Sequence, residues 1–257
     1  MNSPSPGRLV TYPLGAPLPI SEQLVSLSAP GSFASDQYRT LRHAIERLHV
    51  ESGLQVIAVT SSAPGDGKSV TSLNMAGTLA QSPSTRVLII DADLRRPSLA
   101  RYLGLEPLTD PGLAEAIVDE RKDLSDVVVH LARFNLSVLP AGAAQAAPYE
   151  LLNSSRLEAL LAEARRHYDY VIVDTPPLLP FPDCRVLGRH VDGYLVIVAA
   201  HKTPRKLLLE GLRLLDSSKV IGVLFNGDDS PVSNHYGYYA YYNTRGRNRP
   251  PHWWRRS

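Results

Sequence analysis

A short run of glycine, lysine and serine has the residue types that bind the phosphates of a nucleoside triphosphate. Gly65 and Gly67 lack Cβ atoms, so consecutive backbone N–H groups can turn toward an anion and let it approach closely. Lys68 can reach the β- and γ-phosphate oxygens, and the Ser69 hydroxyl can ligate Mg²⁺. We therefore predict a phosphate-binding loop that comprises Ser62, Ala63, Pro64, Gly65, Asp66, Gly67, Lys68, Ser69 and Val70.

The segments on either side of this loop bear on the alternative interpretation, a glycine-rich turn with an incidental lysine. Ser62 stands where the common pattern has its first glycine, which favours the alternative. However, residues 56–59 form an apolar run typical of a strand, and residues 71–80 are compatible with a helix. This order places an anion at a helix N-terminus, where backbone N–H groups and the helix dipole favour negative charge.

Three aspartates follow two further apolar runs. Asp91 and Asp93 come after residues 86–90, and Asp174 comes after residues 170–173. Ligands of open α/β sheets bind at the carboxyl ends of the strands, so we expect these carboxylates to face the phosphates. A carboxylate at such a strand end can hold Mg²⁺ through water, which is the pattern expected beside a phosphate-binding loop.

Strand-like and helix-like segments alternate along most of the chain. Apolar runs at residues 192–200 and 219–226 are two more predicted strands. This alternation predicts an α/β fold of the P-loop NTPase class, with a mostly parallel sheet and helices on both faces. We divide the chain into a flexible, proline-rich N-terminal arm (1–31), a P-loop domain (32–230) and a flexible tail rich in tyrosine and arginine (231–257).

Composition narrows the class of protein. The 257 residues are 44% apolar and 20% charged, as in ordinary soluble domains, and a net charge of +2 gives no reason to expect a nucleic-acid partner. The one cysteine, Cys184, excludes an internal disulfide and fits a reducing cytoplasm. No apolar run approaches the ~20 residues that cross a bilayer, and no signal pattern begins the sequence. We therefore expect a cytoplasmic protein that reaches a membrane only through a partner or through surface contacts.

The last part of the chain concentrates tyrosine and arginine. Five tyrosines lie within seven residues, and no apolar alternation continues around them, which favours a flexible segment over an edge strand. Exposed phenols on the tail of a nucleotide-binding domain are candidate substrates. The candidate phosphorylation sites are Tyr236, Tyr238, Tyr239, Tyr241 and Tyr242.

A helix predicted over residues 32–50 carries charged residues on its polar side. Asp36, Arg39 and Arg42 follow one another at intervals of about one turn, so they project from one face. Most such faces are simply solvated. The alternative is an ion-pairing surface for a neighbouring subunit.

Together these motifs resemble the bacterial tyrosine kinases (BY-kinases) of capsular and exopolysaccharide production, in particular their cytoplasmic kinase domain. Residues 61–69 resemble the Walker A motif of that family, in which Pro-Gly-acid-Gly-Lys-Ser is usual. Residues 88–97 closely resemble its Walker A′ motif, and residues 171–177 resemble its Walker B motif. The tyrosine cluster lies where that family carries an autophosphorylated tail. The similarity extends from about Ser32 to this tail.

The resemblance implies a protein-tyrosine autokinase that uses ATP and Mg²⁺. It implies that a Walker A′ aspartate accepts the phenol proton, and we assign this role to Asp91, with Asp93 and Lys68 as the other catalytic residues. Asn226 is a candidate for reading the adenine edge. Asp93 could instead cap the turn at residues 94–96. The implied metal ligands are Ser69, Asp93 and Asp174.

The resemblance also implies partners. In that family a Glu-x-x-Arg-x-x-Arg helix assembles subunits into a ring, and Asp36, Arg39 and Arg42 match it with Asp in place of Glu. A membrane-embedded polysaccharide co-polymerase would activate the kinase and recruit it to the inner face of the plasma membrane, and a protein tyrosine phosphatase would reverse its reaction. Two alternatives remain: an ATP-dependent oligomerisation switch, and a partitioning-type ATPase. The partitioning and septum-site ATPases carry a lysine where this chain has Ala63, which argues against them.

Overall fold

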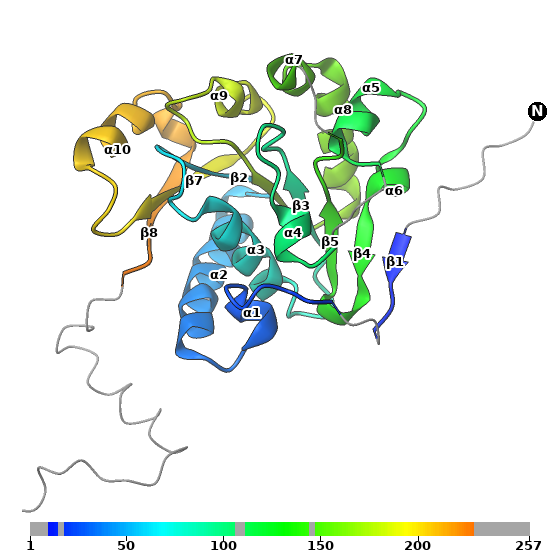
Figure 1. Ribbon diagram of the computed structural model, residues 1–257, viewed down its shortest axis with the longest axis horizontal. Coiled ribbons are helices and arrows are strands. Elements are labelled where there is room, and N and C mark those ends of the chain that lie inside the picture. The colour runs from blue at the N-terminus through cyan, green and yellow to red at the C-terminus, as the bar shows by residue number, and fades with distance from the viewer. Residues whose placement is uncertain (1–9, 15–17, 106–110, 144–146, 229–257) are drawn as a thin grey trace, which may run out of the picture. The chain divides into compact units, whose positions relative to one another are not determined.

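The computed structural model describes residues 10–14, 18–105, 111–143 and 147–228, and Figure 1 shows how its helices and strands are arranged. Within these residues one sheet has eight strands in the order β1-β4-β5-β3-β6-β2-β7-β8. All neighbouring strands are parallel except β4 and β5, so the predicted mostly parallel α/β sheet is confirmed. The strands are β1 (Val10–Tyr12), β2 (Val56–Ser61), β3 (Val87–Asp91), β4 (Val129–Leu131), β5 (Leu136–Leu139), β6 (Tyr170–Asp174), β7 (Gly193–Ala199) and β8 (Val220–Asn226).

Helices cover both faces of this sheet, as predicted. One apolar core contains residues of α1 to α4 and the side chains on one face of the strands. The other contains residues of α5 to α10 and the side chains on the opposite face. The helices are α1 (Val25–Ser28), α2 (Phe33–Ser52), α3 (Lys68–Leu79), α4 (Leu99–Tyr102), α5 (Leu113–Val118), α6 (Leu124–Val127), α7 (Pro148–Leu152), α8 (Ser155–His167), α9 (Asp183–Leu187) and α10 (Arg205–Leu212), with 3₁₀ turns at Ala132–Phe134 and Ser217–Lys219.

Every residue of β2, β3 and β6 is buried, and so are the first six residues of β7. Because helices cover both faces, these strands are continuously apolar rather than alternately apolar and polar, and the polar residues of β2, β3 and β6 stand at their carboxyl ends. This continuity is why the sequence revealed them. It also means that any polar side chain at their carboxyl ends projects from a rigid, water-excluding frame.

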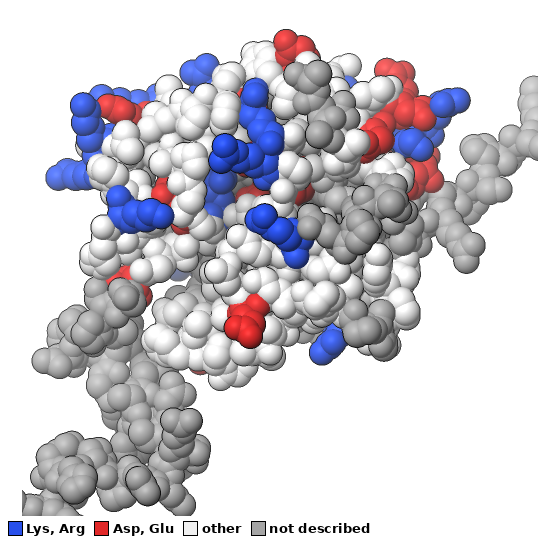
Figure 2. Space-filling view, viewed as in Figure 1, with Lys and Arg blue, Asp and Glu red and all other residues white. Residues whose placement is uncertain are grey.

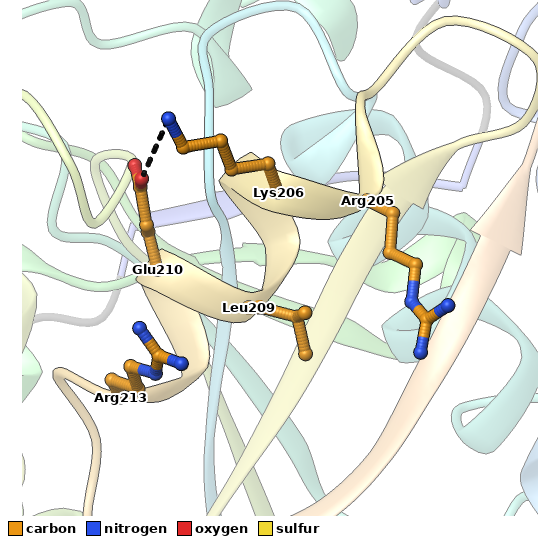
Figure 3. Close-up of a pocket in the computed structure, with 5 residues that line it drawn as sticks. All are labelled: Arg205, Lys206, Leu209, Glu210 and Arg213. Carbon is orange, nitrogen blue, oxygen red and sulfur yellow. Dashed lines mark ion pairs between the residues drawn. The ribbon is translucent and has the colours of Figure 1, made fainter.

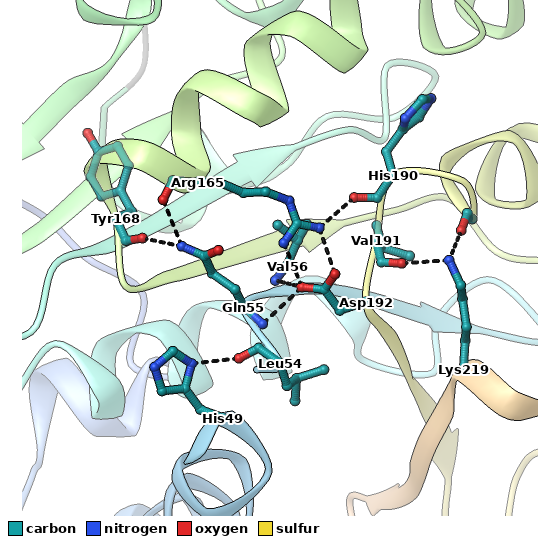
Figure 4. Close-up of polar contacts among 11 residues, drawn as sticks. His49, Leu54, Gln55, Val56, Arg165, Tyr168, His190, Val191, Asp192 and Lys219 are labelled. Atoms are coloured by element: carbon teal, nitrogen blue, oxygen red, sulfur yellow. Dashed lines mark hydrogen bonds and ion pairs between the residues drawn. The ribbon is translucent and has the colours of Figure 1, made fainter. Parts of the chain in front are cut away.

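A partly buried polar network joins the opposite ends of β2 and β7 (Figure 4). Both carboxylate oxygens of Asp192 accept hydrogen bonds from the Arg165 guanidinium, at 2.7 and 2.8 Å. One of them also accepts hydrogen bonds from the backbone N–H groups of Gln55 and Val56, at 3.0 and 2.8 Å. Asp192 therefore joins the start of β2 to the start of β7 and to the end of α8.

The predicted flexible arm over residues 1–31 is wrong for residues 18–31. Leu24 is fully buried, and the Leu27 side chain packs where α3 has Gly77, at which a Cβ would lie 2.6 Å from that leucine. The Ser26 N–H donates to Asn74 Oδ1 at 2.9 Å, and Asn74 Nδ2 donates to the Gln23 carbonyl at 2.9 Å. The leucines scattered among the prolines thus bury enough apolar surface to order this segment on α3.

The structure differs from the predicted domain scheme at two other places. Residues 10–12 form β1, which pairs with β4, and neither short strand was predicted. The compact unit that contains the sheet extends to Asn226, whereas the predicted domain ends at residue 230. Residues 1–9 of the predicted arm and the whole predicted tail (231–257) lie outside the described residues. No helix in the described ranges has both the length and the apolar character needed to cross a bilayer.

Candidate nucleotide-binding site

The predicted phosphate-binding loop connects β2 to α3 at the carboxyl end of β2 (Figure 1). Gly65 and Gly67 have backbone φ angles of 84° and 92°, in the left-handed region that residues with a Cβ rarely adopt. Gly67 is the N-cap of α3, and Lys68 is the first residue of this helix and is largely buried. The strand, loop and helix therefore follow one another in the order that an anion site at a helix N-terminus requires.

Two long-range contacts hold the loop in this shape through Asp66. Its carboxylate accepts a hydrogen bond from the Thr203 hydroxyl at 2.6 Å, and its carbonyl accepts one from Asn226 Nδ2 at 3.0 Å. A Cβ at position 67 would lie 1.9 Å from the same Asn226 nitrogen, so Gly67 permits this approach. Asn226 thus contacts the loop itself. Its predicted role at the adenine edge stays a prediction.

Asp91 and Asp174 lie side by side at the carboxyl ends of β3 and β6, where they are partners in the sheet register. Both are buried, with 1% and 0% of their surface exposed. Asp91 Oδ2 accepts hydrogen bonds from the N–H groups of Ser98 and Leu99, at 2.9 and 3.0 Å. Asp174 Oδ1 accepts one from the Ser72 hydroxyl at 3.0 Å. The second oxygen of each carboxylate has no hydrogen-bond partner among the described residues.

The electrostatics of this pair follow from its burial. Burial, together with the negative charge of Asp174, raises the pKa of Asp91 to about 8, although hydrogen bonds from the N–H groups of Leu99 and Ser98 oppose the rise. Burial also raises the pKa of Asp174, although the positive charge of Lys68 and hydrogen bonds from Ser69 and Ser72 oppose the rise. Two adjacent carboxylates in a medium of low polarizability repel each other unless a cation lies between or beside them.

The residues here fit Mg²⁺. The buried Asp174 Oδ2, which has no hydrogen-bond partner among the described residues, is the kind of hard oxygen ligand that this ion prefers, and the Ser69 hydroxyl contacts Asp174. The neighbouring Asp91 carboxylate adds negative charge beside it. Mg²⁺ sites in phosphoryl-transfer proteins use one or two carboxylates, and substrate phosphates and waters complete the shell. The described residues contain no cluster of three His, Cys, Asp or Glu side chains of the kind that encloses a metal.

Asp93 both caps a turn and faces the site. Its Oδ1 accepts a hydrogen bond from the Arg96 N–H at 3.1 Å, so the capping role considered for it is real. Only 7% of its surface is exposed. Burial raises its pKa, and the nearby charge of Lys68 opposes that rise, so the carboxylate lies within electrostatic reach of the loop lysine. The structure therefore brings together Lys68, Asp91, Asp93 and Asp174, as the sequence predicted.

Basic side chains surround the carboxyl ends of the strands. Lys and Arg residues gather near the middle of the face shown in Figure 2. Exposed basic residues on the loops after β3 and β7, in α9 and at the start of α10 include Arg95, Arg96, Arg185, Lys202 and Arg205. A positive rim of this kind suits a polyanionic ligand.

A shallow groove on α10 is a separate surface feature (Figure 3). One helix supplies all of its lining, which consists of Arg205, Lys206, Leu209, Glu210 and Arg213. Lys206 and Glu210 form an ion pair one turn apart, at 4.0 Å. The groove contains none of the aspartates and no part of the phosphate-binding loop, so it is not the nucleotide site.

The predicted assembly face on α2 is partly engaged within the chain. Arg39 forms an ion pair with Asp36 and donates to the Pro30 carbonyl at 2.7 Å. Arg42 instead donates to Glu46 at 2.7 Å and to the carbonyl of Thr78, at the end of α3, at 3.1 Å. Asp36 and Arg39 therefore remain roughly half exposed, while Arg42 contributes to helix packing.

The sequence analysis did not predict one contact, which joins the segment after β3 to the segment after β6. Arg95, which follows β3, forms a two-pronged ion pair with Asp183, which follows β6. Arg95 lies within the stretch that resembles the Walker A′ motif, so the sequence offers a signal for it, but no motif contains Asp183. The five candidate tyrosines lie outside the described residues.

Comparison with known proteins supplies the family. A protein-family profile described as an AAA domain matches residues 54–215. Tyrosine-protein kinase YwqD of Bacillus subtilis (strain 168) is 34% identical over 223 residues, which are 86% of this chain and 92% of that protein. The chain belongs to the bacterial tyrosine-protein kinases. The family and the enzyme class predicted from the Walker motifs are therefore confirmed.

Two further relatives show how this kinase compares in length and fold. The succinoglycan biosynthesis transport protein ExoP of Rhizobium meliloti (strain 1021) is 35% identical over 210 residues, which are 80% of this chain but only 26% of ExoP. The solved kinase domain of Escherichia coli tyrosine kinase ETK is 30% identical, with a TM-score of 0.74 over 84% of each chain. The kinase thus corresponds to one part of the longer relatives, and its P-loop NTPase fold is the one predicted.

Proposed function

We propose that this kinase binds ATP with Mg²⁺ and transfers the γ-phosphoryl group to the tyrosines of its own tail, Tyr236 to Tyr242. The observation that supports this most is the pair of buried carboxylate oxygens, on Asp91 and Asp174, that lack partners beside the phosphate-binding loop. Such a pair is costly in an empty fold and favourable beside a cation. Family membership supplies the reaction class.

Phosphoryl transfer is catalysed mainly by positioning and by neutralising the charge of the γ-phosphate. Lys68 and the N–H groups of the loop would bind the phosphates, and Ser69, Asp93 and Asp174 would hold the metal. Mg²⁺, when bound, neutralises charge on the phosphates and orients the transferred group. The chain's own contribution is a frame that excludes water and fixes these groups before the nucleotide arrives.

The acceptor must lose a proton during the reaction. A tyrosine hydroxyl has a pKa of ~10, so it is a poor nucleophile at neutral pH until a base accepts its proton. We assign this role to Asp91, whose Oδ1 has no hydrogen-bond partner among the described residues and whose raised pKa makes its ionised form a stronger base. As the phenol oxygen bonds to phosphorus, its proton passes to Asp91 and the bond to the ADP leaving group breaks.

We further propose that the transfer takes place between subunits of a homo-oligomeric ring. Five tyrosines within seven residues cannot enter one active site at once, so a neighbour's site would accept them one at a time. Asp36 and Arg39 on α2 would supply the contact between subunits. Each phosphate adds about −1.5 to −2 charges, so successive transfers should dissociate the ring, and a tyrosine phosphatase should restore it.

The biological setting proposed is the control of exopolysaccharide or capsule polymerisation and export. It is supported by ExoP, whose name describes succinoglycan biosynthesis transport. A membrane-embedded co-polymerase would then activate the kinase and recruit it from the cytoplasm to the inner face of the plasma membrane. The alternatives are an ATP-dependent oligomerisation switch and a partitioning-type ATPase, each with little tyrosine transfer. Ala63 argues against the second of these.

A mixing experiment tests transfer between subunits. A Lys68→Met protein with its tail intact is combined with an otherwise wild-type protein truncated after Ser233, in the presence of Mg-ATP. Phosphotyrosine on the Lys68→Met protein is the expected result, because only the truncated protein can catalyse transfer and only its partner has the tail. If none appears while the truncated protein still phosphorylates an added tyrosine peptide, transfer between subunits is ruled out.

A further inference from the structure

Arg95 and Asp183 form an ion pair just beyond the carboxyl ends of β3 and β6. Arg95 Nε lies 2.6 Å from Asp183 Oδ2, and Nη2 lies 3.1 Å from Oδ1, so the two planar groups meet edge to edge. The guanidinium carbon also lies 4.4 Å from the centre of the Phe181 ring. The Asp183 side chain is buried, with 1% exposed, whereas that of Arg95 is 30% exposed.

This pair joins the loop after β3, which carries Asp93, to the start of α9, which follows β6. Asp93 is two residues before Arg95, and its Oδ1 accepts a hydrogen bond from the neighbouring Arg96 N–H. Asp174 ends the strand whose following loop leads to Asp183. The turn that carries Asp93 is therefore held by two contacts: the hydrogen bond from the Arg96 N–H to Asp93 and the ion pair between Arg95 and Asp183 of α9.

We propose that Arg95 and Asp183 are positioning residues: their ion pair orients the Asp93 turn so that its carboxylate and that of Asp174 converge on the phosphate-binding loop. A buried carboxylate is costly, and an apolar pair of similar volume would join the loops at least as stably. What an apolar pair lacks is the fixed direction of a two-pronged contact. Groups that orient metal-ligating side chains in this way typically change affinity or activity by about 10–100-fold when removed.

The chain contains a matched control at the other end of the same two strands. Arg86 precedes β3 and Asp169 precedes β6, and they form the same kind of pair, with Nη2 at 2.8 Å from Oδ1. Arg86→Lys and Arg95→Lys therefore make the same chemical change at opposite ends of β3. Any general effect of loosening the β3–β6 junction is common to both variants.

The test rests on the proposed tyrosine transfer and compares full-length wild type, Arg95→Lys, Arg95→Met and Arg86→Lys. We expect Arg95→Lys to lower kcat on an added tyrosine peptide about 10-fold and Arg95→Met about 100-fold, with Arg86→Lys within twofold of wild type. Nucleotide affinity without Mg²⁺, measured by titration calorimetry, should stay within threefold for all variants. The Mg²⁺ concentration that half-saturates nucleotide binding should rise for both Arg95 variants.

Each outcome decides one point. Arg95→Met with wild-type kcat and Mg²⁺ dependence would overturn the positioning role. A loss of kcat with a fall in thermal midpoint, but with unchanged Mg²⁺ dependence of binding, would make the pair merely structural and would also overturn it. An inactive wild type would refute the proposed function, whereas the Mg²⁺ dependence of binding would still decide the role of Arg95.

Discussion

Replacing Asp91 with Asn should make the ligand-free kinase more stable. Asp91 is buried beside Asp174, and this environment raises its pKa from 3.8 to about 8. Ionising Asp91 therefore costs more free energy in the folded protein than in the unfolded chain. Asn has the same size, carries no charge, and its amide oxygen can still accept the hydrogen bonds from Ser98 and Leu99.

The size of the effect follows from the pKa difference. One pKa unit corresponds to about 1.4 kcal/mol, so a shift of about 4 units sets an upper bound of about 6 kcal/mol at pH 8. Asp91 and Asp174 share this cost, and relaxation of the site reduces it. We therefore expect Asp91→Asn to raise the free energy of unfolding by about 1–3 kcal/mol, or the thermal midpoint by about 2–10 °C.

The pH dependence has a definite sign. Because the pKa of Asp91 is raised in the folded state, the carboxyl is neutral in both states below about pH 4, and there the variant should gain nothing. The gain should grow as the pH rises from about 4 to 8. Mg-ATP should shrink it, because the cation would stabilise the wild-type carboxylate and not the amide.

The assay is thermal unfolding in EDTA between pH 4 and 8.5, with Asp192→Asn as the control. Burial alone would raise the pKa of Asp192, but hydrogen bonds from Arg165 and from the backbone of Val56 and Gln55 together lower it. Its carboxylate therefore stabilises the fold above about pH 4, and Asp192→Asn should lose stability there. An Asp91→Asn protein less stable than wild type at pH 8, or a gain independent of pH, would refute the reasoning.

Three further predictions concern catalysis, the loop and assembly. Asp91→Asn should still bind ATP but transfer phosphate about 10²–10⁴-fold more slowly, and an unchanged rate would move the base role to Asp93. Asn226→Ala should weaken ATP and GTP binding alike, by about 5–10-fold in calorimetry, whereas loss of ATP preference alone would indicate adenine reading. Arg39→Ala should shift a ring toward monomer in light scattering and leave the thermal midpoint unchanged. Arg42→Ala should do the same and also lower the midpoint. A wild-type protein that is monomeric with and without ATP would contradict this prediction.

Many strands and helices, and the phosphate-binding loop, were predictable because each has a pattern within its own stretch of sequence. The buried strands are continuous apolar runs, and the phosphate-binding loop needs glycines and lysine at fixed spacing. The helix α8 also has a signal of its own in the sequence, because Ser154 caps its start and four apolar residues share one face. Signals of this kind lie within a single element and need no knowledge of its neighbours.

The contacts that the sequence did not reveal join distant parts of the chain. Arg95 and Asp183 are 88 residues apart, and the contact between Asn226 and Asp66 spans 160 residues. The N-terminal segment was misjudged for a similar reason, since its prolines suggested disorder and only the surface of α3 explains why Leu24 is buried. The short β4 was missed because the antiparallel β5 stabilises it, rather than any pattern of its own.

The central claim is that this fold transfers phosphate from ATP to tyrosine through its Walker A lysine. The most direct measurement incubates purified wild-type and Lys68→Met proteins with Mg-ATP and locates phosphotyrosine by mass spectrometry, with circular dichroism to verify folding. Phosphate on Tyr236 to Tyr242 of the wild type and none on Lys68→Met is the predicted result. Undiminished phosphotyrosine on a folded Lys68→Met protein would contradict the account.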